Sequence, residues 1–391
     1  MIKRNILDCM KLVGKAPSYY ENEKTYVSTG AVDCDHIDYT QSEKVTYDNR
    51  PSRANLSVNE GDILFAKMCG TKKTLLVDKT MSDCLFSTGF YAVRANESVI
   101  TTQLLYYLLS SDQFLSQKDR NSSGATQKAI TNSGLKKINV CVPDLKEQFE
   151  IEKRLTCIDQ MIAKQQEQLI FLDQLVKSRF IELFGDSFLN EKNWTVDKLG
   201  NYITVLTDFS ANGSYEKLDS NVIMYDEPNY ALMIRTVDFE SGHFDISNAK
   251  YIDRNAYELL SKSKLFGGEL IMSKIGSAGR IFMMPYLDVP ASLGRNAFMF
   301  RFNEQINMMF LFVLLSSEYG QAEINQFVRG AVTKTITKDS VRNIRIIVPP
   351  IELQNQFADF VAEADKSKLA VQEGLQELET LKKSLMQQYF G

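Results

Sequence analysis

The chain is short of the residues that build metal sites and nucleophilic active sites. Its 391 residues include only two histidines, His36 and His243, and six cysteines that form no C-x-x-C pair. A structural zinc site needs clustered Cys and His ligands, and Ser–His or Cys–His catalysis needs a histidine in a recognisable context. Neither histidine has one. We therefore predict no metal site and no nucleophilic catalysis in this chain, and we assign both histidines to exposed loops.

Long apolar runs and a basic bulk charge are absent as well. No stretch approaches the roughly 18 consecutive apolar residues of a membrane span. The first residues lack the apolar centre of a signal peptide, so we expect no membrane contact, a cytoplasmic location and reduced thiols. With 8 Pro and 20 Gly, long flexible linkers are not expected. The net charge of −4 excludes indiscriminate attraction to phosphates but permits a local basic face.

Sequence signatures of nucleotide chemistry are also missing. The chain has neither a G-x-x-x-x-G-K-[ST] loop nor a G-x-G-x-x-G segment, the two common backbone cradles for phosphates. Gly267 and Gly268 are followed by Glu269, whose charge would repel a phosphate, so this segment is interpreted as a turn. The Asn/Asp-Pro-Pro-aromatic element of amino-methyltransferases is absent too. These absences favour a protein that binds rather than catalyses.

What the chain does have is an internal repeat. The segment 124–131, GATQKAIT, is matched by GAVTKTIT at 330–337, at an offset of 206 residues (330 − 124). The match continues without a gap to the Phe-Gly pairs that end at residues 185 and 391. Such a long period excludes a solenoid and indicates a two-fold tandem duplication, with units of about 1–185 and 186–391.

Each repeat begins with a β-rich stretch and ends in one long helix. Runs of β-branched and aromatic residues predict strands at 62–66, 91–94, 138–142, 298–302 and 344–348. Apolar runs predict short buried helices at 102–110 and 308–316. We therefore expect an α+β fold with two globular domains, 1–145 and 186–350. Each is followed by a helix, at 146–185 and 351–391.

The two long helices carry apolar residues at heptad spacing. The predicted seam comprises Ile151, Leu155, Ile158, Ile162, Leu169, Leu172 and Val176, and then Phe357, Val361, Val371, Leu375, Leu378 and Leu385. Gln165 and Lys368 are polar intruders, and Gly374 is the one glycine before the closing Phe-Gly pairs. Apolar residues that repeat every 3.5 residues form a stripe that a helix buries against another helix. Because the chain has two such helices, the simpler interpretation is that they pair with each other. The alternative is that each helix packs on its own domain.

Basic loops with glycines occupy matching positions in the two repeats. Lys67-Met-Cys-Gly-Thr-Lys-Lys73 corresponds to Lys274-Ile-Gly-Ser-Ala-Gly-Arg280. Glycines let a backbone approach a phosphate, and Lys, Arg, Gln and Asn can contact phosphates or base edges. The candidate DNA-binding residues are Arg50, Arg53, Lys67, Thr71, Lys72, Lys73, Gln127, Lys128, Lys274, Ser277, Arg280, Arg295, Asn296, Thr333 and Lys334. The alternative is that each loop is a solvated hairpin tip.

Taken together, these features resemble the specificity subunit of type I restriction–modification systems. The resemblance rests on two copies of a strand, a Pro-x-Leu/Ile-x-x-Gln segment and a long helix that closes on Ser-x-x-x-x-x-Phe-Gly. These segments start at Pro143 and Pro349 and close at Ser178–Gly185 and Ser384–Gly391. The first repeat departs from the family pattern at its start. The second repeat opens with Trp194-x-x-x-x-Leu-Gly, whereas the first has only Leu12-Val-Gly14 and lacks the Trp. That leaves residues 1–20 either divergent or truncated.

The resemblance implies a working arrangement for the chain. Two target recognition domains each read half of a bipartite sequence in double-stranded DNA. The two helices pair antiparallel, with pseudo-two-fold symmetry, and fix the spacer. Two modification subunits dock on this scaffold and methylate adenine with S-adenosylmethionine. Restriction subunits add translocation and cleavage with ATP and Mg, so no cofactor is expected in this chain.

Two other classes of function stay open at this stage. One is a coiled-coil scaffold that assembles proteins without touching DNA, which would lack a basic face on its globular parts. The other is an enzyme with an unrecognised site, which would need converging titratable groups in a cleft.

Overall fold

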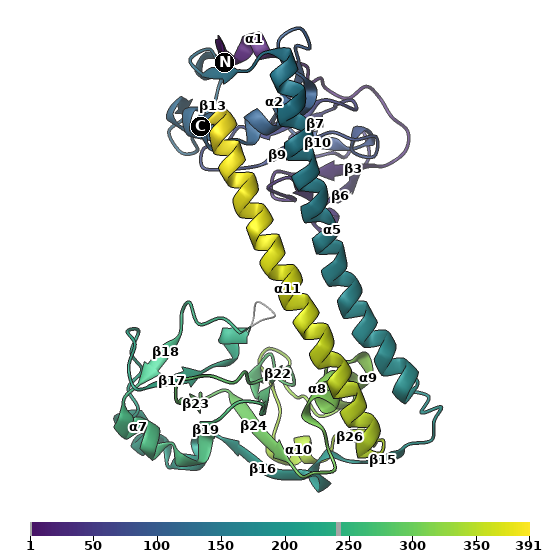
Figure 1. The fold of residues 1–391 in the computed structure, drawn as a ribbon, viewed down its shortest axis with the longest axis vertical. Helices are drawn as coiled ribbons and strands as arrows, with labels where there is room; N and C mark the ends of the chain where they lie inside the picture. The colour runs from purple at the N-terminus through teal and green to yellow at the C-terminus, as the bar shows by residue number, and fades with distance from the viewer. Residues whose placement is uncertain (1, 240–243) are drawn as a thin grey trace. The chain divides into compact units, whose positions relative to one another are not determined.

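The computed structural model describes residues 2–239 and 244–391 and divides into two compact units. Unit 1 comprises Met1–Gln168 and Val371–Gly391, and unit 2 comprises Leu169–Ala370. Two 40-residue helices, α5 (Leu145–Phe184) and α11 (Ile351–Phe390), are each divided between the units (Figure 1). Each unit therefore contains one globular part and one portion of both helices.

The globular part of unit 1 is built on two four-stranded sheets. One has the order β2-β11-β8-β9 (Met10–Leu12, Phe90–Ala95, Ile63–Ala66, Thr74–Leu76) and is antiparallel. The other has the order β6-β3-β10-β7 (Glu43–Val45, Lys24–Val27, Leu85–Ser87, Ala54–Leu56), with β3 and β10 parallel. Short pairs join β1 (Ile2–Asn5) to β14 (Asn139–Val142), β4 (Val32–Asp33) to β5 (His36–Ile37) and β12 (Ser122–Ser123) to β13 (Ala129–Ile130). The helices are α1 (Ile6–Cys9), α2 (Thr102–Ser110), α3 (Asp112–Arg120) and α4 (Asn132–Leu135).

Unit 2 repeats this strand order. Its sheets are β16-β24-β20-β22 (Ile203–Asp208, Ala297–Phe302, Leu270–Ser273, Ile281–Met283) and β18-β17-β23-β19 (Lys250–Ile252, Ala231–Ile234, Ala291–Leu293, Lys264–Leu265). Here β17 and β23 are the parallel pair. Short pairs join β15 (Thr195–Lys198) to β26 (Arg345–Val348) and β21 (Ile275–Gly276) to β25 (Lys334–Thr335). The helices are α6 (Tyr215–Asn221), α7 (Arg254–Leu259), α8 (Met308–Ser316), α9 (Glu318–Asn325) and α10 (Lys338–Arg342).

The elements expected from the sequence are confirmed with small shifts at their ends. The five predicted strands correspond to β8, β11, β14, β24 and β26, and the two short apolar helices to α2 and α8. The predicted α+β fold with two paired helices is confirmed as well. The proposed pairing of Leu12–Gly14 with Leu199–Gly200 is wrong. The amides of Ile6 and Leu199 make the equivalent hydrogen bonds, to Ile138 and Ile344, so Ile6 is the counterpart of Leu199.

Segments of α5 and α11 complete the hydrophobic core of each unit. In unit 1, Tyr389 and Phe390 at the end of α11 are buried in one cluster with Ile151 and Leu155 of α5. In unit 2, Phe180 and Phe184 of α5 pack on Phe310 of α8 and Phe357 of α11, with ring centroids 4.7 to 5.8 Å apart. The helices therefore pack on a globular part and on each other, so the two packing modes weighed from the sequence occur together.

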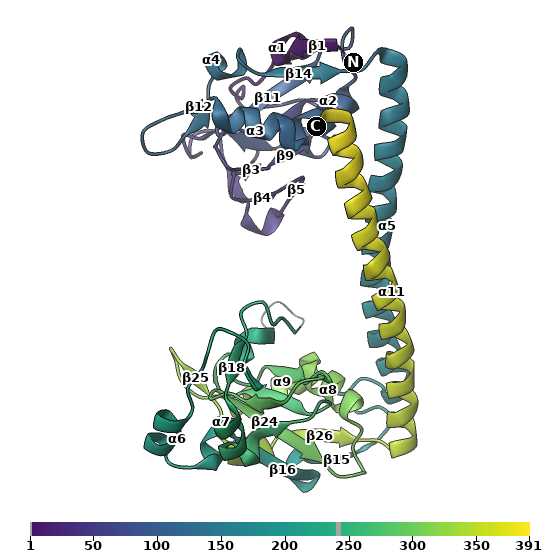
Figure 2. The same ribbon diagram turned by 60° about the vertical axis from the view of Figure 1, so that its left-hand side comes forward.

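The two helices run antiparallel within each unit (Figure 2). In unit 1, Lys382 forms an ion pair with Asp159 at 2.7 Å, and in unit 2, Lys368 does so with Asp173 at 2.7 Å. Each partner lies 14 residues, or two heptads, from its counterpart on the same helix (173 − 159 and 382 − 368). Lys368, a polar intruder in the sequence pattern, thus has an acidic partner across the helix pair.

The helix seam also contains a close contact between glutamine and glycine. A Cβ atom on Gly374 would lie only 2.9 Å from Nε2 of Gln165. The space left by the missing side chain of Gly374 thus accommodates the amide of Gln165. The predicted seam positions are all buried or half-buried, whereas Ile170, Phe171 and Leu175 are exposed.

A buried glutamine anchors the start of each long helix. The Gln354 side chain accepts a hydrogen bond from the Asn307 amide at 2.9 Å and donates to the carbonyls of Gln305 and Pro349 at 3.1 and 2.8 Å. Gln148 makes the same three bonds, with Thr101, Val99 and Pro143. The glutamine of the repeated motif therefore joins each helix to the loop that precedes α2 or α8.

We predict that Gln354→Leu lowers the free energy of unfolding of unit 2 by about 2–4 kcal/mol, because it removes three hydrogen bonds and leaves the buried carbonyl of Pro349 without this partner. Urea denaturation followed by the fluorescence of Trp194 measures this, since Trp194 is the one tryptophan and belongs to unit 2. The matched control is Gln356→Leu, two residues along the helix at an exposed position, which should change stability by less than about 0.5 kcal/mol. Equal effects of the two substitutions would contradict the anchoring role.

Candidate nucleic-acid interface

Two sequence motifs that are far apart in the chain meet in the globular part of unit 1. The amide of Cys69, in the basic loop, donates to the carbonyl of Lys128, and the amide of Ile130 donates to that of Lys67, each at 2.9 Å. The loop 67–73 therefore lies against the repeated segment that begins at Gly124. The sequence identified each segment alone but gave no sign that they pair.

The same two motifs pair in unit 2. The amide of Ile336 donates to the Lys274 carbonyl at 3.1 Å, and β21 pairs with β25. Gly124 and Gly330 have φ angles of 144° and 105°, and a Cβ atom there would lie 2.3 and 2.1 Å from a backbone oxygen. Only glycine fits such a turn, which accounts for its presence at the start of both copies.

A buried lysine that the sequence reasoning missed holds the basic loop of unit 1. Lys118 of α3 is 1 % exposed, and its ammonium donates to the carbonyls of Met68 and Thr71 at 3.0 and 2.8 Å. Burial lowers the pKa of Lys118, and the nearby Asp119 acts in the opposite direction. Asp119 also accepts from the Gly70 amide at 3.1 Å. These bonds fix the conformation of the loop.

The paired loops of unit 1 form one wall of a cleft of about 370 Å³. Its lining also includes residues that follow the parallel strands β3 and β10, namely Thr29, Gly30, Thr88 and Gly89. Six of the candidate residues line it, namely Arg53, Lys67, Thr71, Lys73, Gln127 and Lys128. No carboxylate is among its lining residues, so the cleft is basic.

Two of these lysines are positioned by backbone carbonyls. Lys67 donates to the carbonyl of Thr88 at 2.8 Å and lies over the ring of Tyr91, 4.4 Å from its centroid. Lys73 donates to the carbonyl of Thr29 at 2.8 Å. Burial lowers the pKa of Lys67. Neither ammonium has an acidic partner within residues 2–239 and 244–391, so each can offer charge to an anionic ligand.

Two other candidates of unit 1 lie outside this cleft. Lys72 points to Asp112, with which it forms an exposed ion pair at 2.7 Å. Arg50 stacks on Tyr47 at 4.1 Å and also bonds to its carbonyl. Lys72 and Lys73 are neighbours in the sequence but face different surroundings, as successive residues of an extended chain do.

Lys274, the counterpart of Lys67, pairs with a carboxylate in unit 2. It pairs with Asp208 at 3.0 Å, and Lys338 pairs with the same carboxylate at 2.8 Å. Burial alone would raise the pKa of Asp208, but hydrogen bonds from Lys338, Lys274 and Ser210 outweigh it and hold that pKa below its usual value. The two lysines match in sequence, yet they differ in the charge that they can offer a ligand.

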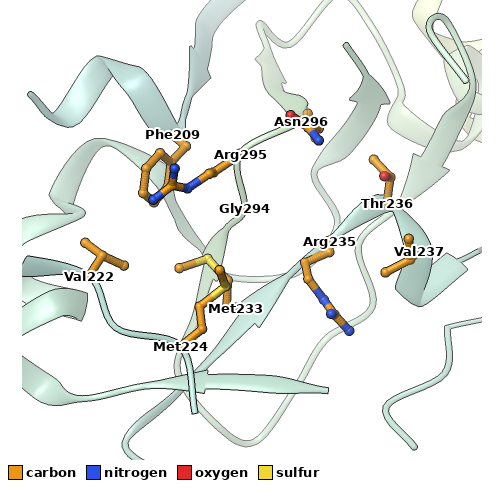
Figure 3. Close-up of a pocket in the computed structure, with 11 residues that line it drawn as sticks. Phe209, Val222, Met224, Met233, Arg235, Thr236, Val237, Gly294, Arg295 and Asn296 are labelled. Atoms are coloured by element: carbon orange, nitrogen blue, oxygen red, sulfur yellow. The ribbon is translucent and has the colours of Figure 1, made fainter. Parts of the chain in front are cut away.

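Unit 2 has a cleft of about 280 Å³ at the corresponding strand ends (Figure 3). Its lining includes Arg295 and Asn296 after β23, and Arg235, Thr236 and Val237 after β17. The other candidates of this unit lie apart from it. Ser277 bonds to Ser273, Arg280 lies over Phe282, and Thr333 and Lys334 are exposed beside β21.

The described part of the chain shows no group of three or more His, Cys, Asp or Glu side chains arranged to hold a metal ion. His36 is exposed and lies 3.5 Å from the Asp35 carboxylate, whereas His243 falls outside the described residues. Within the same residues, no helix combines the length and apolar character needed to cross a bilayer.

Comparison with known proteins identifies the family. The type I restriction modification DNA specificity domain matches twice, at residues 9–172 and 191–380. The type I restriction enzyme MjaVIII specificity subunit of Methanocaldococcus jannaschii is 23% identical over 339 residues, which cover 84% of this chain and 78% of that one. The EcoBI specificity subunit of Escherichia coli is 23% identical over 325 residues, which cover 76% and 67% of the two chains.

A solved structure supports the fold. The type I restriction-modification S subunit from M. genitalium aligns over 100% of this chain and 96% of its own, with a TM-score of 0.55 at 15% identity. At this identity the likeness concerns the fold alone. Because the family sequence matches cover most of the chain in two successive copies, the protein belongs to the type I restriction modification DNA specificity domain family and is a recognition component rather than an enzyme.

Proposed function

We propose that this chain is the subunit that reads a bipartite DNA target for a type I restriction–modification complex. In this proposal, residues 1–145 and 186–350 are two target recognition domains, and each reads one half of the target. The observation that carries it is the recurrence of a cleft at the ends of the same parallel strand pair in each unit, with Lys or Arg side chains in its lining. A scaffold that never contacts DNA would not need this surface.

The chemistry of the unit 1 cleft suits a polyanion. Four of its lining side chains, Arg53, Lys67, Lys73 and Lys128, are cationic. Lys and Arg fix a protein on the phosphate backbone, and Arg and Gln can also contact base edges in the major groove. Because the whole chain has a net charge of −4, we expect the isolated subunit to bind DNA weakly until partners add basic surface.

We further propose that the helices dock two modification subunits. Ile170, Phe171 and Leu175 of α5 are 58, 56 and 49 % exposed, although they are large and apolar. Exposed apolar side chains grouped on one helix are typical of a protein contact. The modification subunits would supply S-adenosylmethionine chemistry on adenine, and restriction subunits would supply ATP- and Mg-dependent translocation and cleavage.

The function is tested by mapping methylated adenines in cells that carry this chain with its modification partner. We expect one asymmetric target made of two short specified halves with a fixed unspecified spacer between them. A continuous target, or methylation that does not depend on this chain, would exclude the proposal.

The role of the unit 1 cleft is tested by Lys73→Ala combined with Lys128→Ala. We expect weaker DNA binding by the assembled complex and a salt dependence, d log K/d log[salt], that is shallower by about two, because two phosphate contacts are lost. Lys72→Ala is the matched control, since its ammonium lies outside the cleft on Asp112. Gel-shift titrations across a salt series measure all three forms, and a Lys72→Ala effect as large as that of the pair would remove the cleft from the interface.

The helix pair is proposed to set the spacer length. Seven residues inserted into both helices, between Asp159 and Asp173 and between Lys368 and Lys382, keep the two ion pairs in register. The insertion adds about 10 Å of helix, and the spacer should therefore lengthen by about three base pairs. The same insertion in α5 alone breaks the register and should abolish methylation. An unchanged spacer after the double insertion would contradict the proposal that the helix pair sets the spacer length.

A further inference from the structure

We propose that the cleft of unit 2 recognises an A·T base pair by holding the 5-methyl group of thymine against its apolar floor. The inference rests on the proposed function, because it names the chemistry that one recognition domain reads. It concerns the cleft lined by residues of β17, the segments that follow β17 and β23, the Phe209 turn and the loop after α6 (Figure 3).

The two clefts share the strand ends of the duplicated fold, whereas their other lining residues come from different segments. The amide of Lys67 donates to the Gly89 carbonyl at 2.9 Å, and the amide of Lys274 donates to the Asn296 carbonyl at 2.8 Å. Asn296 is therefore the counterpart of Gly89. The strand pairing places Val27 and Ile234 at corresponding positions, so the residues that follow them in the two clefts correspond as well.

The linings of the two clefts differ in chemistry. In unit 2, Phe209, Val222 and Met233 form a floor in which each residue is at most 6 % exposed. Met224 and Val237 stand at its rim, 45 and 50 % exposed. None of these five side chains can make a strong hydrogen bond, so they cannot hold a phosphate oxygen or a polar base edge.

The arginines of the unit 2 cleft are already paired with carboxylates. Arg235 bonds to Asp238 at 2.6 Å, and Arg295 bonds to Asp219 at 2.8 Å. Their carboxylates offset part of the positive charge of this cleft, in contrast to the basic cleft of unit 1. The floor between the arginines favours an apolar ligand group.

In the major groove of DNA, the base edges expose one such group, the 5-methyl of thymine. The polar group best placed to complete the pair is Asn296, which is exposed and whose side chain has no hydrogen-bond partner among the described residues. An Asn amide can bond bidentately to N6 and N7 of adenine. An apolar floor beside a free Asn amide thus matches the two halves of an A·T pair.

The test uses the assembled complex and duplexes of its mapped target, in which uracil replaces one thymine at a time. Uracil keeps the base pair and loses only the methyl. We expect one position, in one half of the target, where this change weakens binding about four- to tenfold. In the double variant Met224→Ala with Val237→Ala, thymine and uracil duplexes should bind within about twofold of each other.

Val289→Ala is the matched control. Val289 belongs to the same unit, is 50 % exposed like Val237, and does not line the cleft. The control variant should keep the full preference for thymine over uracil.

Two outcomes would overturn the inference: no thymine position that is sensitive to uracil, or a preference that persists in the double variant. Each leaves the proposed function standing, because the target itself is mapped beforehand. Failure to find a bipartite target would instead refute the proposed function.

Discussion

The antiparallel packing of α5 against α11 is the constraint on which the rest of the structure depends. Neither globular part closes its core with residues from its own β-rich segment alone. Unit 1 needs Tyr389 and Phe390 from the end of α11, and unit 2 needs Phe180 and Phe184 from the end of α5. Because the ion pairs of the two helices follow one heptad register, the packing of the helices and the folding of the recognition parts are coupled.

Duplication has kept the backbone of the two units and changed the charge that they display. The strand order, the anchoring glutamines and the paired loops recur, whereas the electrostatic surroundings of matching side chains do not. Lys67 donates to a carbonyl and lies over an aromatic ring, but Lys274 pairs with Asp208. At the position of Asp208, the strand pairing of unit 1 places Gly14, which has no side chain to supply a charge. The residue at this one position therefore accompanies the different partners of the two matching lysines.

Local patterns in the sequence determine most of the fold. The apolar runs at Thr102–Ser110 and Met308–Ser316 have the same bounds as α2 and α8, and the heptad pattern finds both long helices. The predicted site is less complete because its parts come together only through tertiary contacts. Lys72 and Lys73 are adjacent residues of the same type, but Lys72 pairs with Asp112 and Lys73 donates to the carbonyl of Thr29. No local sequence pattern predicts that Lys118 holds the basic loop 67–73. Nor does any predict that residues after β3 and β10 line the same cleft.

The contact between Gln165 and Gly374 has a consequence for how such helix pairs change over time. Any side chain at position 374 would displace the amide of Gln165, which can move because it is the end of a flexible side chain. A small residue at position 374 should therefore be tolerated, whereas a large one would need a shorter residue at position 165. Recombination between relatives that exchanges one helix and keeps the other would separate these partners, so crossovers that respect the pair should be favoured.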